Sequence, residues 1–210
     1  MKQLVLCLTL AAIPGFCSER HTSLSPISLY TQFQQAPPKA MEDGLHDELG
    51  SIMGPIGLHF EWRSLTPSRP SNEFSVELAV VTFKGRCDAS GLLAVRSYPG
   101  ALGWTHVSDG NILPFSDVDC DRIRGFVQRE LLSVPFDERE ETFGRAVARV
   151  LAHELYHIFA NTAKHGSCGV GKAAYTVEEL LSGEFVFEER DSQALRTGKT
   201  HTALEIAGSN

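Results

Sequence analysis

The chain has 210 residues, of which 42% are hydrophobic and 21% are charged, and this length is sufficient for one domain with a buried core. At pH 7 its formal net charge is -7, with 26 acidic residues against 19 Lys and Arg. Proteins that bind nucleic acid carry clustered Lys and Arg to contact the phosphate backbone. The sequence has no such cluster, so we expect no nucleic-acid partner.

Residues 1–17 have the layout of a secretory signal peptide. Lys2 is followed by an apolar run from Leu4 to Ile13, and a Pro-Gly pair ends the run. The run is too short for a permanent transmembrane helix, and no other apolar stretch of the sequence reaches spanning length. We therefore expect a secreted or periplasmic protein with no stable membrane insertion after the signal is removed.

Residues 18–40 are rich in Ser, Pro, Gln and Thr and show no sustained apolar period. This composition predicts a poorly ordered leader or an extended leader strand. We place the folded domain at residues 41–197. Residues 198–210 are expected to form a flexible tail.

Apolar periodicity predicts a series of helices and strands along the domain. In chain order these are a helix at 41–53, strands at 57–63, 74–83 and 92–98, a hairpin at 104–115 and a helix at 117–132. The pair Asp109-Gly110 predicts the hairpin turn. The segment after Gly183 predicts a further short strand and a helix.

A long helix is predicted from about Glu138 to Asn161. Asp137 and Glu140 form a candidate capping box at its start, and apolar residues recur at helical spacing through the segment. Helices combined with several strands predict an α+β fold, in which a mixed β-sheet is packed by helices.

Three cysteines remain once Cys7 and Cys17 leave with the signal peptide. In an oxidising compartment we expect a disulfide between Cys87 and Cys120, which would stabilise the fold by about 4 kcal/mol in the chain-entropy model. Three reduced thiols are the alternative. Cys168 has no partner in this scheme, and we expect it to be a buried small residue.

The stretch AHELYHIFANTAKHG, residues 152–166, carries a candidate metal site. His153 and His157 are four residues apart, so they share one face of the long helix and can direct both imidazoles at one metal ion. Glu154 is turned toward the same side, where it can accept a proton from a zinc-bound water. Without a metal, these are polar groups on an apolar helix, which is unfavourable unless other groups satisfy them.

A catalytic zinc site needs a third protein ligand as well as an open position for water. His165 is one candidate, because the helix can end at Asn161 and the chain can then turn back under the metal. Glu178 or Glu179 is the other, as a glutamate on a following helix. Sequence spacing permits either.

The stretch from Arg149 to Leu180 resembles the metzincin-like zinc metalloproteases. The resemblance rests on AHELYH, IFANT, KHG and GVG, which match AHE-x-x-H, a short apolar stretch with Ser or Thr, a His followed by Gly or Ser, and a Gly-Leu-Met turn. It implies zinc on His153, His157 and His165, with Glu154 as general base. The third histidine lies two residues further along than is usual in metzincins.

Gly171 stands where the family's turn places a methionine beneath the metal. This departure predicts looser packing there and leaves catalysis open. Tyr175 follows the turn, and by the same resemblance it can donate a hydrogen bond to an oxyanion. The alternative for Tyr175 is an aromatic residue that anchors the turn.

The sequence therefore predicts an exported, monomeric zinc metalloendopeptidase with Zn2+ as cofactor. It would hydrolyse peptide or protein substrates through a zinc-bound water activated by Glu154. One alternative is a catalytically inactive zinc-binding protein of the same fold. The other is a gluzincin-like peptidase with Glu178 or Glu179 as third ligand.

Overall fold

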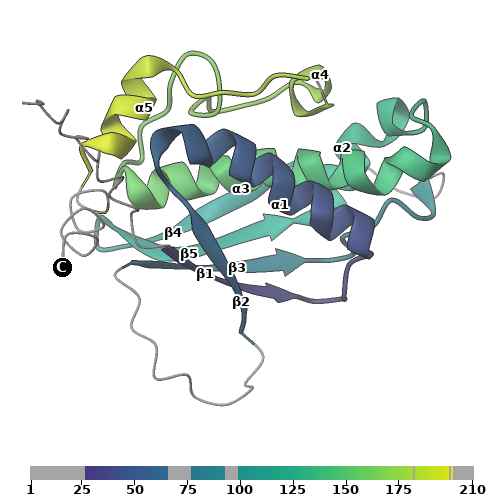
Figure 1. The fold of residues 1–210 in the computed structure, drawn as a ribbon, viewed down its shortest axis with the longest axis horizontal. Helices are drawn as coiled ribbons and strands as arrows, with labels where there is room; N and C mark the ends of the chain where they lie inside the picture. Colours follow the sequence, from purple (N-terminus) through teal and green to yellow (C-terminus); the bar gives the residue numbers. More distant parts are fainter. Residues whose placement is uncertain (1–26, 66–76, 93–98, 182, 199, 201–210) are drawn as a thin grey trace, which may run out of the picture.

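In the computed structural model of the protein, the described residues are 27–65, 77–92, 99–181, 183–198 and 200. They form a five-stranded mixed sheet with helices packed against it, so the predicted α+β fold is confirmed (Figure 1). The predicted signal peptide, most of the strand predicted at 92–98 and most of the predicted tail lie outside these ranges. Within them, none of the helices combines the length and the apolar character that a membrane span requires.

The sheet orders its strands β2-β1-β3-β5-β4. Their bounds are Ile27–Phe33 for β1, Phe60–Ser64 for β2, Leu78–Lys84 for β3, Gly103–Ser108 for β4 and Asn111–Asp119 for β5. β1 pairs in parallel with β2 and β3, and β3 pairs in parallel with β5. β4 runs antiparallel to β5 through the predicted Asp109-Gly110 turn, so β4 is an edge strand.

The expectation of a poorly ordered leader is wrong for residues 27–33, which form β1 between β2 and β3. Apolar residues occupy alternate positions of this segment, and Ile27 and Leu29 are fully buried. Ser28 and Gln32 lie between the apolar positions, so the average composition of the leader concealed a strand with one apolar face. The fold therefore begins before residue 41.

Helices cover one face of the sheet, where α1 and α3 lie side by side (Figure 1). The described α-helices are α1 at Lys39–Met53, α2 at Cys120–Leu131, α3 at Arg139–Phe159, α4 at Val177–Leu181 and α5 at Glu189–Arg196. The alternating residues Ala79, Val81 and Phe83 of β3 are fully buried in the core that this layer closes. Because α3 lies within this layer, most of its side chains are buried.

Two local predictions are wrong. Glu140 does not cap α3, because its carboxylate accepts a hydrogen bond from the backbone N–H of Ala89 at 2.9 Å, and a short 3-10 turn at Phe136–Glu138 leads into the helix instead. The strand predicted after Gly183 is absent from residues 184–188, where the backbone N–H of Val170 donates to the Val186 carbonyl without a strand ladder. The helix predicted after it is α5.

Helices α1 and α3 approach each other backbone to backbone at two glycines. A Cβ at Gly44 would lie 2.5 Å from the carbonyl oxygen of Glu141, and a Cβ at Gly144 would fall within 3.0 Å of the Met41 carbonyl. The side chain of Arg149 joins the same helices, since its Nε lies 2.6 Å from Glu48 Oε1. Its Nη1 also donates to the carbonyl of Glu179 in α4 at 2.7 Å.

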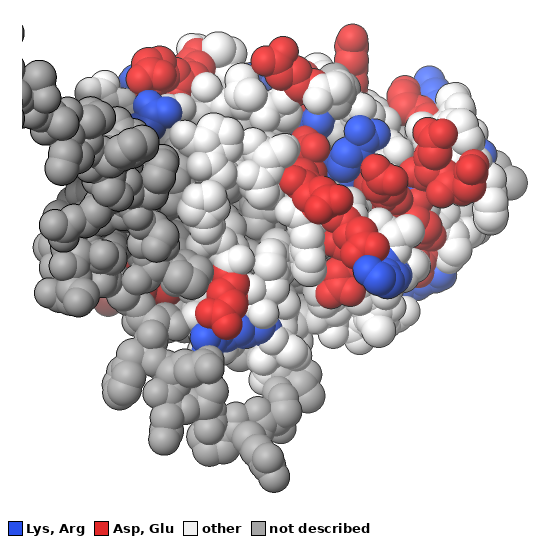
Figure 2. All heavy atoms as spheres, viewed as in Figure 1, with Lys and Arg blue, Asp and Glu red and all other residues white. Residues whose placement is uncertain are grey.

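The exposed side of α1 is acidic. Figure 2 shows carboxylates gathered along it, which include those of Glu42, Asp43 and Asp47. The hydrogen bond from Lys39 to Asp43 raises the pKa of that lysine. This face therefore carries a substantial part of the negative net charge.

The predicted disulfide between Cys87 and Cys120 is present, and both residues are buried. It joins the chain after β3 to the first residue of α2. Cys168 is free, as expected, but the prediction that it is buried is wrong. Its loop faces the protein with glycine backbone, so the thiol is left exposed, where it donates to the carboxylate of Glu188.

We predict that Gly44→Ala lowers the free energy of unfolding by about 2 kcal/mol, because the new methyl group forces the α1 and α3 backbones apart. Gly50→Ala is the matched control, since Gly50 lies in the same helix with no atom near its Cβ position. That variant should be more stable than the parent by up to about 1 kcal/mol, from helix propensity. Urea unfolding of the three proteins checks both values, and equal stability of the two variants would contradict the contact.

Candidate metal centre

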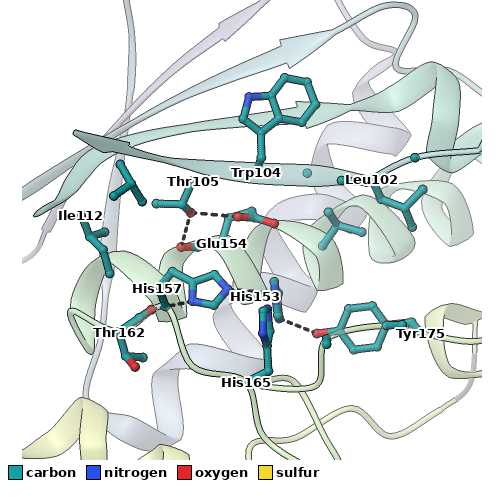
Figure 3. A pocket seen from close by; sticks show the side chains of 18 of the residues that line it. Leu102, Trp104, Thr105, Ile112, His153, Glu154, His157, Thr162, His165 and Tyr175 are labelled. Atoms are coloured by element: carbon teal, nitrogen blue, oxygen red, sulfur yellow. Dashed lines mark hydrogen bonds between the residues drawn. The ribbon is translucent and has the colours of Figure 1, made fainter. Parts of the chain in front are cut away.

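Helix α3 places His153 and His157 one turn apart on its inner face, where they are 7% and 8% exposed. Their rings are almost perpendicular, and their Nε2 atoms lie 3.0 Å apart. The predicted convergence of the two imidazoles on one point is therefore observed (Figure 3).

The other ring nitrogen of each histidine is hydrogen-bonded to a backbone carbonyl. Nδ1 of His153 lies 2.8 Å from the Val170 carbonyl oxygen, and Nδ1 of His157 lies 2.7 Å from that of Thr162. A carbonyl oxygen only accepts hydrogen bonds, so each Nδ1 carries the proton. In a neutral imidazole the Nε2 atom then holds a lone pair, which is the form that binds a metal.

The chain after α3 returns to the same point. Asn161 adopts a left-handed conformation, with φ 47°, and the backbone N–H of Thr162 donates to the His157 carbonyl. His165 then stacks on His153 with ring centroids 5.2 Å apart. The candidate ligand atoms of the three histidines all lie within 4.8 Å of one another.

The Nε2 atoms of His153 and His157 cannot hydrogen-bond to each other, because both present lone pairs. At 3.0 Å these lone pairs repel unless a cation lies between them. A tetrahedral metal bound by imidazole nitrogens and open to one further ligand matches this donor set, and zinc is the metal that prefers it. The residues present therefore fit a zinc ion.

Glu178 and Glu179, the other candidates for third ligand, do not line the pocket. The Glu179 carboxylate instead binds the ammonium group of Lys172 and the backbone N–H of Thr176. Glu178 is an exposed residue in the first turn of α4. Of the two sets of ligands that the sequence left open, the part of the chain described here brings only the histidines together.

Burial keeps the two helix histidines uncharged at neutral pH. It lowers the pKa of His153 to about 4, although the hydrogen bond to Val170 acts in the opposite direction. The pKa of His157 is lowered for the same reason. Both are thus available as metal ligands without competition from protons above this range.

Glu154 lies beside the histidines under the edge strand β4 (Figure 3). It is 4% exposed, and its Oε2 accepts a hydrogen bond of 2.8 Å from the Thr105 hydroxyl. A Cβ at Gly103 would lie 3.0 Å from its Oε1, so the glycine leaves room for the carboxylate. Burial raises the pKa of Glu154 to about 7, against the opposing effect of the Thr105 hydrogen bond.

Gly103 and Thr105 were not identified from the sequence. They alternate along β4 and therefore face the same side of the strand, which is the only sequence signal they carry. Their importance depends on β4 being the edge strand that runs over α3, and no motif in the sequence specifies this.

Tyr175 also lines the pocket, but its hydroxyl lies on the far side of His153 from the other histidines. The hydroxyl donates to the Val170 carbonyl and lies 2.9 Å from Nδ1 of His153. Burial raises the pKa of Tyr175, so the phenol stays protonated at neutral pH. In this arrangement Tyr175 helps to orient His153, and its donation to an oxyanion stays a prediction.

The space beneath the histidines is filled, although the methionine of the family's turn is missing. Val170 is fully buried, and its carbonyl orients His153. A Cβ at Gly171 would fall within 3.0 Å of Oδ2 of Asp191, which occupies this position from α5. The expectation of looser packing here is therefore wrong, because a carboxylate takes the place of the side chain.

The pocket in front of the histidines has a volume of about 610 Å³. Glu154 is the acidic residue in its lining, and apart from the histidines the remaining lining residues are uncharged. The wall opposite α3 comes from residues 99–105, and Phe126 and Val150 add apolar surface. Such a pocket suits an uncharged, partly apolar ligand.

No family model matches the chain, and none of the curated proteins compared with it matches its sequence. Among solved structures, the chain is similar to archaemetzincin from Methanopyrus kandleri, with 13% sequence identity and a TM-score of 0.47. The match covers 85% of this chain and 97% of that chain. The likeness is one of backbone shape, and the interpretation of the site rests on the residues of this chain.

We predict that Glu154→Gln stabilises the metal-free protein at high pH. From pH 4.5 to about 7 the native carboxyl holds its proton more tightly than the unfolded chain does, so stability is lost as the pH rises through this range. The variant avoids this loss, and its advantage should grow from near zero below pH 4.5 to about 3 kcal/mol at pH 8.

Urea unfolding in the presence of a chelator, at a series of pH values, measures this difference. Glu178→Gln is the control, because the side chain of Glu178 is exposed and should give no comparable gain. Parallel pH profiles for the parent and Glu154→Gln would refute the prediction.

Proposed function

We propose that the protein is an exported zinc metallopeptidase in which His153, His157 and His165 hold the metal and Glu154 is the general base. The observation that carries the proposal is the pair of unprotonated Nε2 atoms 3.0 Å apart, with a third imidazole against them. Three imidazoles leave a tetrahedral zinc ion one open position, as catalytic rather than structural sites do.

When bound, the zinc ion supplies Lewis acidity, which polarises a carbonyl group and lowers the pKa of a water molecule toward ~7. Glu154 takes a proton from the attacking water and returns it to the leaving amine. Its pKa of about 7 suits both transfers near neutral pH. The Thr105 hydroxyl holds one carboxylate oxygen and leaves the other free to face the pocket.

A peptide or protein substrate fits the edge of the sheet that borders the pocket. β4 is the last strand of the described sheet, and its outer backbone groups are available for pairing with an extended chain. The uncharged lining would accept a peptide side chain beside the cleaved bond. Endopeptidase specificity and the monomeric state belong to this proposal.

Export is supported by the disulfide between Cys87 and Cys120, since disulfides persist in oxidising compartments. The test of the whole proposal is metal content and chelator-sensitive cleavage of a peptide library by the purified protein. One zinc per chain without cleavage would instead indicate the inactive zinc-binding protein. Absence of bound metal would exclude both.

We predict that His165→Ala weakens zinc binding by at least ~100-fold, because even outer-shell partners of a metal contribute 10–100-fold to affinity. Glu178→Ala and Glu179→Ala should bind zinc as the parent does, since neither side chain lines the pocket. Competition with a chromophoric chelator measures the affinities. Parental affinity in His165→Ala would remove this residue from the ligand set.

We also predict that Glu154→Gln keeps one zinc per chain but cleaves peptides at least ~100-fold more slowly, the lower end of what positioned proton transfer contributes. The amide retains the size of the carboxylate and an acceptor for Thr105, so the fold and the metal ligands are preserved. Turnover of the zinc-loaded parent and variant is compared at pH 7.5. Equal rates would show that another group moves the proton.

A further inference from the structure

His165 differs from the other two histidines in how it is held. His153 and His157 are buried and hydrogen-bonded through Nδ1, whereas His165 is exposed. Its ring makes no hydrogen bond to any described residue. The position of its imidazole must therefore come from the backbone that follows it.

That backbone is a small closed loop at residues 166–171. The N–H of Gly166 donates to the carbonyl of Gly171 at 2.6 Å, and Gly166 also forms a bridge with Lys172. The loop thus begins directly after His165 and ends directly after Val170. Any shift of its base moves the third histidine.

The base of this loop rests on the carboxylate of Asp191. A Cβ at Gly166 would lie 2.6 Å from Asp191 Oδ2, and a Cβ at Gly171 would be closer than 3.0 Å to the same atom. Two glycines are therefore needed where the loop meets the carboxylate. Asp191 is 1% exposed, and its Oδ2 has no hydrogen-bond partner among the described residues.

Asp191 is itself fixed by its other oxygen. Oδ1 accepts a hydrogen bond of 3.2 Å from the Tyr156 hydroxyl in α3. It also accepts two from the guanidinium of Arg190, of 3.1 and 2.9 Å. One carboxylate thus joins the helix that carries two ligands to the loop that carries the third.

We infer that Asp191 is a positioning residue for His165. Its carboxylate, held against α3 by Tyr156, sets the height of the 166–171 loop and hence the distance of the third imidazole from the other two. This inference rests on the proposed zinc site and adds to it a residue that contacts neither metal nor substrate. It also accounts for a buried carboxylate that proton transfer does not use.

The test is a double-mutant cycle read as zinc affinity. Asp191→Ala should weaken zinc binding by about 10–100-fold, the usual effect of losing an outer-shell support. In a His165→Ala background the same substitution should change the affinity by less than about 3-fold, because the residue it positions is gone. Asp191→Asn, which keeps the shape and an acceptor for Tyr156, should restore most of the parental affinity.

Leu195→Ala is the matched control, because it removes a buried side chain from the same helix without touching the loop. It should lower thermal stability but leave zinc affinity unchanged. If Asp191→Ala does not fold, Gly166→Ala tests the contact from the loop side and should also weaken zinc binding by about 10-fold.

Parental affinity in Asp191→Ala, or in Gly166→Ala when only that variant folds, would overturn the inference alone. An equal loss on substituting Asp191 with and without His165 would do so too, since it would show a general effect on the fold. A parent that binds no zinc would overturn the proposed function as well.

Discussion

Two backbone carbonyls determine the chemistry of the site. The carbonyl oxygens of Thr162 and Val170 keep the protons of His157 and His153 on Nδ1, and so turn two lone pairs toward each other at 3.0 Å. To supply these carbonyls, the chain has to fold back onto α3 twice, once directly after the helix and once in the 166–171 loop. The third histidine lies between the two contacts, which is why it reaches the same point.

Helix α3 can serve as the frame of the site because it is held on every side. α1 touches it at the level of the backbone, and the buried Arg149 links it to Glu48 and to α4. A buried ion pair adds little net stability, but an arrangement that leaves one partner alone is strongly disfavoured. The pair therefore selects one packing of α1 on α3. From the other side, Thr105 of β4 holds Glu154 in place.

Helical spacing is enough to predict the two histidines of α3 and their glutamate, since residues four apart must share a face. His165 was one of two candidates, because spacing does not determine how a chain returns after a helix ends. Thr105 and Asp191 carry no motif, and their roles depend on which strand forms the edge and which helix lies beneath the loop. Residues 27–33 were mistaken for part of a poorly ordered leader because composition was averaged over a segment whose information lies in its alternation.

The close approach of the two Nε2 atoms also couples folding to metal supply. Unfolding separates the histidines, so the unfolded chain binds zinc weakly, while the native chain is relieved of a repulsion when the ion enters. A metal that binds only the native state adds about 2.7 kcal/mol of stability when its free concentration is 100 times the dissociation constant. With the proposed zinc site, the resistance of this protein to heat would therefore vary with the zinc content of its surroundings, and depletion of the ion would favour its degradation as well as its inactivation.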